Sequence, residues 1–133
     1  MESARDRRSG FSCGITLWGD AVVVSLSGEL DIACAAHLRR GMVRALSSTE
    51  SPHVVVDLRG VGFCDSSGLS ILISAAHSAE AKGGRLELSG VQPRVTRVLN
   101  ITGLNRRFQT FDTIADAVGI PDLPGDPGAV ARH

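Results

Sequence analysis

The sequence predicts an α/β fold, a mixed sheet of four to six strands that begins with an N-terminal β-hairpin and carries about four packed helices. Apolar stretches at 15–18 and 21–26 are joined by Gly19-Asp20, which is the pattern of a hairpin with a tight turn. The run "HVVVDL", residues 53–58, is continuously apolar and β-branched, as is typical of a strand covered on both faces. Strand-like and helix-like segments alternate after the hairpin, and this alternation predicts helices packed on the sheet.

The first helix is expected over 32–46, directly after "GELD". Asp31 is a good N-cap because its side chain can accept hydrogen bonds from the amides of the first turn. One face of the helix is apolar and the other carries Arg40, Arg44 and His37. The apolar face consists of Ala35, Leu38, Met42, Ala45 and Leu46.

The second helix is expected to begin within "GVGFCDSSGLSILISAA", residues 60–76, where 61–64 complete the preceding strand. Asp65 is its expected N-cap. Gly83 or Gly84 suits the left-handed position after the last turn. The apolar positions at helical spacing are Leu69, Leu72, Ile73, Ala76 and Ala79.

Three further elements complete the domain. "RLELS", residues 85–89, alternates like a strand, and a shorter helix over 92–103 has Pro93 in its first turn and Gly103 at its end. "RFQTF" predicts a last strand over 107–111. "DTIADAVG" predicts a last helix, capped by Asp112 or Thr113.

The 133 residues are enough for one domain, which we expect over 11–120 between a flexible arm, 1–10, and a flexible tail, 121–133. The formal net charge is zero, so no basic excess indicates direct binding of nucleic acid. The apolar runs are too short to span a bilayer, and the first residues lack the apolar middle of a secretory signal. We therefore expect a cytoplasmic protein with no membrane partner.

Metal, nucleotide and hydrolase chemistry each lack their usual pattern. Cys34 and His37 have helical spacing, but two ligands do not make a zinc site, and the three cysteines are read as buried small residues. The glycines around residue 62 do not match a phosphate-binding loop. A G-x-S-x-G elbow would need glycine where Cys64 stands. We expect no metal, no cofactor and no catalytic residue.

"DSSG", residues 65–68, has two interpretations from its residues alone. Asp65, Ser66 and Ser67 can simply cap a helix. The two serines would also sit at the positive end of that helix, where an added phosphate is electrostatically tolerated. The pattern shows that the site is able to carry a phosphate, and it leaves open whether it does.

The segment "VVVDLRGVGFCDSSGLSILISAA" resembles the signature of STAS domains, specifically of bacterial anti-sigma factor antagonists. "VVSLSGELDIACAAHL" and "KGGRLELSGVQPRVTRVLNITGL" are similar to two further family segments in the same order. The resemblance extends from about residue 11 to 118. Cys64 is a mild departure, because Val, Ile or Met is frequent before the motif aspartate.

The resemblance implies regulation by partner switching. The unphosphorylated antagonist would bind an anti-sigma factor that is itself a serine kinase, which frees a sigma factor. The kinase would phosphorylate Ser66, with Ser67 as second choice, and the phosphorylated antagonist would dissociate from it. A PP2C-type phosphatase would then remove the phosphate and restore the binding form. The partner surface implied by the family comprises Gly28, Glu29, Asp31, Asp65, Ser67 and Gly68.

A helical wheel adds an expectation about the outward face of the second helix. It places Ser67 opposite the apolar face and Ser66 near the edge, although a wheel is least reliable at the first helical residue. The outward face reads Ser67, Ser70, Ile71, Ser74, Ala75 and Ser78, without a charge. This face is either a chance result of composition or a docking surface for the kinase that includes Ser70, Ile71 and Ser74.

Two other functions stay open from the sequence. The chain could be a STAS interaction module of a stress-signalling or lipid-transport complex. It could also be a small serine-dependent enzyme, although the triad would need a base that the sequence does not place near Ser66.

Overall fold

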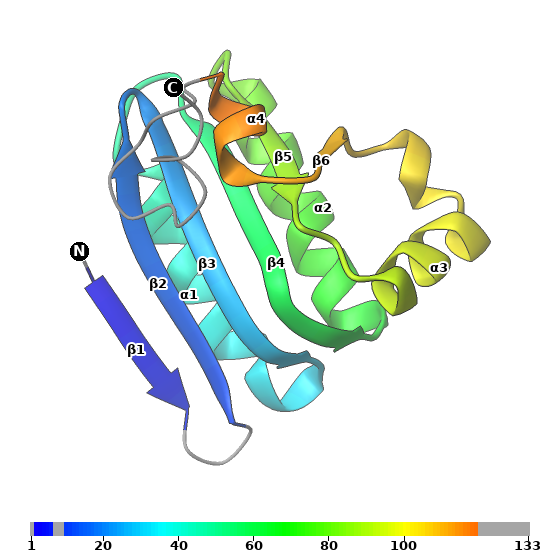
Figure 1. Cartoon of the computed structure of the whole chain (residues 1–133). Coiled ribbons are helices and arrows are strands. Elements are labelled where there is room, and N and C mark those ends of the chain that lie inside the picture. Colours follow the sequence, from blue (N-terminus) through cyan, green and yellow to red (C-terminus); the bar gives the residue numbers. More distant parts are fainter. Residues whose placement is uncertain (1, 7–9, 120–133) are drawn as a thin grey trace, which may run out of the picture.

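The computed structural model describes residues 2–6 and 10–119, which form one six-stranded sheet with its strands in chain order. The first three strands are antiparallel neighbours, whereas the third to the sixth run parallel, so the mixed sheet is confirmed (Figure 1). The strands are β1 Glu2–Asp6, β2 Phe11–Trp18, β3 Ala21–Leu30, β4 His53–Cys64, β5 Arg85–Ser89 and β6 Thr110–Phe111.

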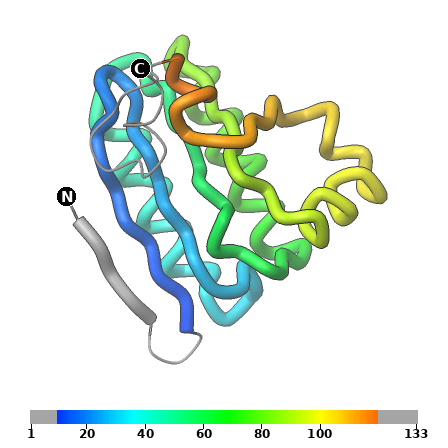
Figure 2. The backbone as a smooth tube through the Cα atoms, in the orientation of Figure 1, coloured from blue at the N-terminus to red at the C-terminus, as the bar shows by residue number. Residues whose placement is uncertain are grey.

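The helices connect the parallel strands and cover both faces of the sheet unequally. α1 and α2 lie side by side on one face, and the short α4 lies on the other (Figures 1 and 2). α3 packs beside the second half of β4. The helices are η1 Ile32–Cys34, α1 Ala35–Leu46, α2 Ser66–Ala81, α3 Pro93–Thr102, η2 Leu104–Arg106 and α4 Ile114–Val118.

The larger hydrophobic core fills the space between the sheet and the α1/α2 layer. Alternate strand residues such as Val54 and Val56 point into it and are fully buried. Val55 points to the opposite face, where Val23 and Ile114 join it in a small second cluster under α4. β4 is thus covered on both faces at this level, as its continuous apolar run predicts.

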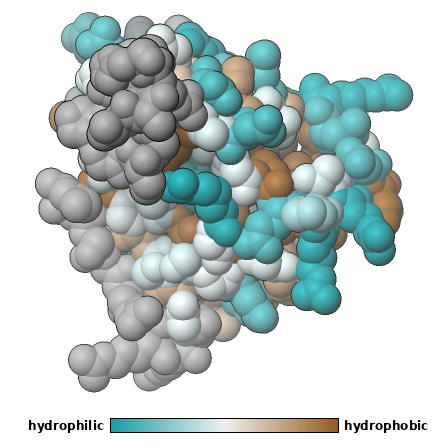
Figure 3. Space-filling view, viewed as in Figure 1, coloured by the Kyte–Doolittle hydropathy of each residue, from teal (hydrophilic) through white to brown (hydrophobic). Residues whose placement is uncertain are grey.

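The surface opposite α1 and α2 is mixed in character. Where described residues are visible in Figure 3, hydrophilic and near-neutral side chains alternate with smaller hydrophobic areas. Ser25 is exposed on this side of β3, and the buried carboxylate of Asp57 is paired with the Arg59 guanidinium at 3.1 Å. Among the described residues that Figure 3 shows, this side of the sheet presents no large apolar face.

Most predicted element boundaries are confirmed. Gly19 turns the hairpin with a φ of +64°, and Gly83 and Gly103 follow α2 and α3 in the left-handed region. Thr113 caps α4 by accepting a hydrogen bond from the Asp116 amide at 3.0 Å. The last strand is shorter than the predicted 107–111, because η2 and its turn take up the residues before Thr110.

The N-terminal segment differs from its prediction. Glu2–Asp6, predicted as part of a flexible arm, form the edge strand β1, paired antiparallel with β2 from Glu2–Ile15 to Asp6–Phe11. Edge-strand pairing uses backbone groups, so the polar side chains of this segment carried no apolar pattern that could predict it. The predicted tail, 121–133, lies outside the described residues.

Candidate functional site

Two aspartates follow the carboxyl ends of two neighbouring parallel strands. Leu30, the last residue of β3, pairs with Cys64, the last residue of β4, and Asp31 and Asp65 come directly after them. The Asp65 amide donates a hydrogen bond to the Leu30 carbonyl at 2.9 Å. The segments "GELD" and "DSSG" are therefore joined side by side at one edge of the sheet, as the family resemblance implied.

Each aspartate caps the helical segment that follows it. Asp65 has an extended backbone, and its Oδ1 accepts from the Ser67 amide at 2.8 Å and the Gly68 amide at 3.2 Å. Asp31 Oδ1 accepts in the same way from Ala33 at 3.0 Å and Cys34 at 3.3 Å. Both predicted N-caps are confirmed, although the segment after Asp31 begins as the 3₁₀ turn η1 before α1.

Gly68 allows the first turn of α2 to touch the end of β3. A Cβ at this position would lie 2.7 Å from Leu30 Cβ, 2.8 Å from the Leu30 carbonyl oxygen and 3.1 Å from Cys64 Sγ. No side chain fits in that space, so the role of Gly68 is to let the backbones approach.

Gly28 has a comparable backbone role one element earlier. Its φ is +102°, and a Cβ there would lie 2.8 Å from the Gly10 carbonyl oxygen. The pairing register of β3 and β4 shifts directly after it, which bends the strand toward the turn at Asp31. Gly28 and Gly68 shape the site, whereas Glu29, exposed at the end of β3, contributes a side chain to its surface.

The two serines are exposed in the opposite order to the wheel's expectation. Ser66, the first residue of α2, is exposed, whereas Ser67 is only half-exposed. The wheel assumes an isolated helix, but at this position the chain is still leaving β4 and the first turn of α2 packs on Leu30. The structure thus presents the hydroxyl of Ser66 more openly than that of Ser67.

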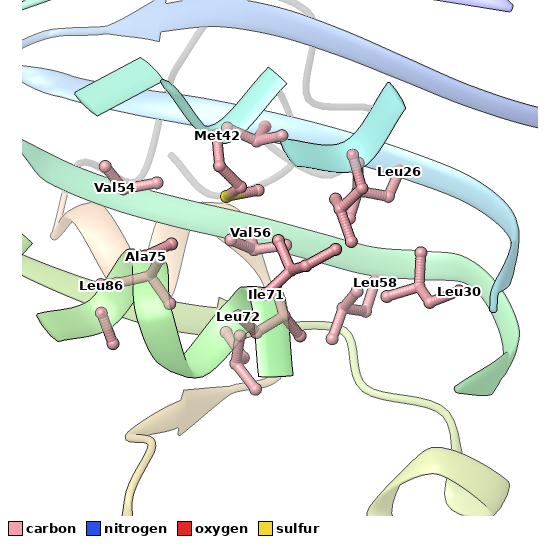
Figure 4. Close-up of a cluster of buried hydrophobic side chains, with 14 of the residues drawn as sticks. Leu26, Leu30, Met42, Val54, Val56, Leu58, Ile71, Leu72, Ala75 and Leu86 are labelled. Carbon is pink, nitrogen blue, oxygen red and sulfur yellow. The ribbon is translucent and has the colours of Figure 1, made fainter. Parts of the chain in front are cut away.

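The predicted outward face of α2 is partly wrong. Ser70 and Ser74 are exposed, but Ile71 and Ala75 are each 4% exposed and belong to the main core. Figure 4 shows Ile71 and Ala75 of α2 in the same layer as Met42 of α1. The predicted partner contact Ile71 is therefore an internal packing residue.

A shallow groove remains between α1 and α2 where these residues meet. Its volume is about 210 Å³, and Val43, Ser74 and Ser78 line it together with edges of the buried apolar residues. The groove is a boundary between two packed helices, and its exposed rim is formed by Arg39 and Val43 of α1 and by Ser74 and Ser78 of α2.

Two buried thiols lie beneath the capped turns. Burial and, to a smaller extent, the nearby Asp65 carboxylate together raise the pKa of Cys64 to about 12. Burial also raises the pKa of Cys34, whose Sγ donates to the Asp31 carbonyl at 3.3 Å. Both thiols stay protonated at neutral pH, so neither is an activated nucleophile. The interpretation of the cysteines as buried small residues is confirmed for Cys13, Cys34 and Cys64.

Sequence reasoning missed two apolar side chains beside the site, Ile32 and Phe63, which are exposed. Strand periodicity offered no signal for Phe63, because the burial pattern does not alternate at the end of β4, where Val61 and Cys64 are both buried. Ile32 follows the capping aspartate directly, where a residue of the first turn points to solvent.

The described residues carry neither a metal-binding cluster nor a membrane-spanning helix. Within residues 2–6 and 10–119 no group of three or more His, Cys, Asp or Glu side chains could hold a metal ion. No helix in these ranges has both the length and the apolar character needed to cross a bilayer. At the carboxyl ends of β3 and β4, Ser66 presents an exposed hydroxyl directly after Asp65, and a serine hydroxyl can accept a phosphoryl group.

Comparison with known proteins agrees with this geometry. A family model of the STAS domain matches residues 16–117. An anti-sigma F factor antagonist of Paenibacillus polymyxa is 32% identical over 73% of this chain and 83% of its own length. An anti-sigma-B factor antagonist of Bacillus subtilis is 29% identical over 62% of this chain and 74% of its own length. The crystal structure of an anti-sigma factor antagonist from Mycobacterium paratuberculosis superimposes with a TM-score of 0.75 at 26% identity, covering 87% of this chain and 97% of that one. The chain therefore belongs to the STAS-domain family of anti-sigma factor antagonists.

Proposed function

We propose that this antagonist is switched by phosphorylation of Ser66. In the unphosphorylated state it binds an anti-sigma factor that is also a serine kinase, and this binding frees a sigma factor. In the kinase reaction the Ser66 Oγ bonds to the γ-phosphorus of ATP, its proton leaves, and ADP departs as the old phosphorus–oxygen bond breaks. The phosphorylated chain then dissociates, and a PP2C-type phosphatase hydrolyses the phosphate to restore the hydroxyl.

The observation that carries the proposal is the position of Ser66. It is the exposed first residue of α2, it directly follows the capping Asp65, and its neighbour Ser67 is less exposed. A kinase active site must enclose the target hydroxyl closely, so the more open of the two serines is the better substrate. This supports Ser66 on geometric grounds that are independent of the family pattern.

The proposed partner surface surrounds Ser66 at the carboxyl edge of β3 and β4. Glu29, Asp31 and Asp65 make it acidic, and Ser67, Ser70 and Ser74 extend it along α2. Gly28 and Gly68 act through the backbone approach that they permit. We propose that this surface binds the kinase in the cytoplasm, without direct contact of the chain with nucleic acid or membrane.

The test is phosphorylation by a purified anti-sigma kinase, with mass spectrometry to locate the phosphate. Ser66→Ala and Ser67→Ala form a matched pair, because each removes one hydroxyl beside the same cap. The expected result is a phosphate on Ser66 in the wild type and in Ser67→Ala, and none in Ser66→Ala. Phosphate on Ser67, or full phosphorylation of Ser66→Ala, would contradict the assignment. A pull-down from native lysate with Ser66→Ala as bait would supply candidate kinases.

A further inference from the structure

Large apolar side chains that face water are few in the described part of the chain. They are Leu17, Ile32, Val43, Phe63 and Ile101. Single exposed apolar residues are normal and need no explanation. Ile32 and Phe63 differ because both lie beside the same exposed serine, although they come from different elements.

Both residues lie near the junction of β3 and β4 that Ser66 follows in the chain. Leu30 and Asp65 are joined by a hydrogen bond of 2.9 Å, and Ile32 and Phe63 each stand two residues from one end of it. Two residues of chain span at most about 7 Å. Ile32 and Phe63 therefore both lie close to the junction of β3 and β4, and Ser66 comes directly after Asp65 at that junction.

The two side chains point away from the core that their neighbours fill. Phe63 is 42% exposed, although Cys64 and Val61 in the same strand are buried. It pairs with the exposed Glu29 of the neighbouring strand β3, so the ring and a carboxylate share one face of the sheet. Ile32 is 77% exposed and contributes nothing to the core clusters. Ile32 therefore adds little to the stability of the isolated domain by burial, and Phe63 keeps a large part of its ring in water.

The charge around these residues indicates what kind of surface would cover them. The segments 28–36 and 60–76 contain three acidic residues, Glu29, Asp31 and Asp65, and no lysine or arginine. A complementary surface would present an apolar pocket for each side chain and a basic rim for the carboxylates. Such a surface belongs to a folded protein that recognises this edge of the sheet from outside.

We propose that Ile32 and Phe63 are apolar anchors that the anti-sigma kinase buries when Ser66 enters its active site. This inference rests on the proposed function and adds to it the residues that supply affinity. Binding energy at protein interfaces is concentrated in a few apolar or aromatic residues, which are surrounded by polar contacts that contribute little. The anchors position Ser66, and the charged rim selects the partner.

The test measures the affinity of Ile32→Ser and Phe63→Ser for the purified anti-sigma kinase that phosphorylates the wild-type chain, by calorimetric titration with ADP. Each substitution should raise the dissociation constant by about tenfold or more. Leu17→Ser is the matched control, because Leu17 is 66% exposed and pairs with Val22 near the start of β3. Val22 and Leu30 are eight residue steps apart along β3, which corresponds to about 26 Å. This control should bind like the wild type.

Several outcomes would overturn the inference. Wild-type affinity in both variants, with native circular dichroism, would remove the anchors from the interface. An equal loss in Leu17→Ser would make the effect non-specific. If sedimentation showed that the substitutions abolish self-association of the chain while kinase affinity is unchanged, a second copy would be the occupant instead. Failure of the proposed function looks different, since the wild type itself would then neither bind nor be phosphorylated by any anti-sigma kinase.

Discussion

At the scale of single residues, the Asp65 carboxylate already uses the amides that a phosphate on Ser66 would seek. Its Oδ1 accepts from the amides of Ser67 and Gly68. A helix N-terminus is attractive to an anion mainly through such free amides and through the helix dipole. A phosphate on Ser66 would therefore still be attracted by the helix dipole. The amides of Ser67 and Gly68, however, already donate to Asp65, and the Asp65 carboxylate would repel the phosphate.

The close approach at Gly68 gives a stability prediction. In Gly68→Ala the new methyl group would lie within 2.8 Å of Leu30 Cβ and of its carbonyl oxygen. We expect the free energy of unfolding to fall by about 1–3 kcal/mol in urea titrations, despite the better helix propensity of alanine. Gly62→Ala is the control, because its nearest neighbour would be Gln92 Oε1 at 3.8 Å, and it should change stability by no more than about 0.5 kcal/mol. Equal stability of both variants would contradict the crowding at Gly68.

The buried thiols predict how stability depends on alkaline pH. Burial raises the pKa of Cys13, Cys34 and Cys64 above the ordinary 9.0, so above this pH the unfolded chain loses thiol protons that the folded chain keeps. The contribution of the thiols to stability should be constant below about pH 9 and fall above it, by up to about 1.4 kcal/mol per pH unit for each such thiol, and for Cys64 this decline continues toward pH 12. Urea titrations from pH 8 to pH 11 measure this decline.

Two variants control this experiment, because tyrosine and lysine also titrate in this pH range. The chain has no tyrosine, and Lys82 is its single lysine, so Lys82→Arg should keep the decline and Cys64→Ala should reduce it. A stability independent of pH in this range would refute the interpretation.

At the scale of elements, α2 is covered from two directions. The sheet buries Leu72 and Ala76, and α1 buries Ile71 and Ala75 from the side. A helix that contacts only a sheet has one apolar stripe, whereas a helix with a second neighbour buries a wider arc. Small residues on that side let α1 and α2 approach closely.

This packing predicts different effects for two substitutions on α2, one on stability and one on binding. Ile71→Glu should destabilise the fold by more than about 3 kcal/mol, because it places a carboxylate in the core. Ser74→Arg should keep its stability, because Ser74 is exposed, and should weaken kinase binding if the rim of the groove is contacted. Thermal melts and calorimetric titrations check the two effects. Ser74→Ala is the control, since it removes the hydroxyl without adding bulk and should bind normally. A native-like melt of Ile71→Glu would contradict the observed burial.

At the scale of the whole molecule, the topology of the sheet creates the site. β3 and β4 are parallel neighbours, so their carboxyl ends, Leu30 and Cys64, meet although they are far apart in sequence. The crossover through α1 separates these two segments along the chain and rejoins them in space. A partner that binds this edge contacts both segments at once.

The phosphorylation switch is a prediction for the whole complex. A phosphate on Ser66 adds about −1.5 to −2 charges at pH 7 next to Asp65 and Asp31, and binding would take it out of water. Affinity for the kinase should fall about a hundredfold or more, since an unpaired buried charge costs roughly 3 kcal/mol. Calorimetric titration of both forms with ADP measures this loss, and equal affinities would refute the switch.

Two variants and the melting of the free protein control that experiment. Ser66→Ala should bind like the unphosphorylated form and never be released, whereas Ser66→Asp should lose only part of the affinity. The free phosphorylated protein should be less stable by no more than about 1 kcal/mol, because the site is exposed and screened by salt. A larger loss of stability would mean that the phosphate acts on the fold rather than on the interface.

The local features of the site were predictable from sequence. Asp31 and Asp65 cap the segments that follow them, Gly83 and Gly103 follow their helices, and Gly19 turns the hairpin. Each of these depends on hydrogen bonds or backbone angles between residues only a few positions apart. The chain neighbours that decide such features are visible in the sequence itself.

Exposure was decided only by the tertiary structure. Ile71 is buried because α1 lies beside α2, and Ser66 is more exposed than Ser67 because the first turn of α2 packs on Leu30. The edge strand β1 likewise exists because β2 offers it backbone partners. A helical period describes one helix against one surface, whereas burial is set by every element that packs around a residue. The sequence by itself thus determined the caps, the turns and the mixed α/β character, and the packing of the first turn of α2 on Leu30 decided which of the two serines is more exposed.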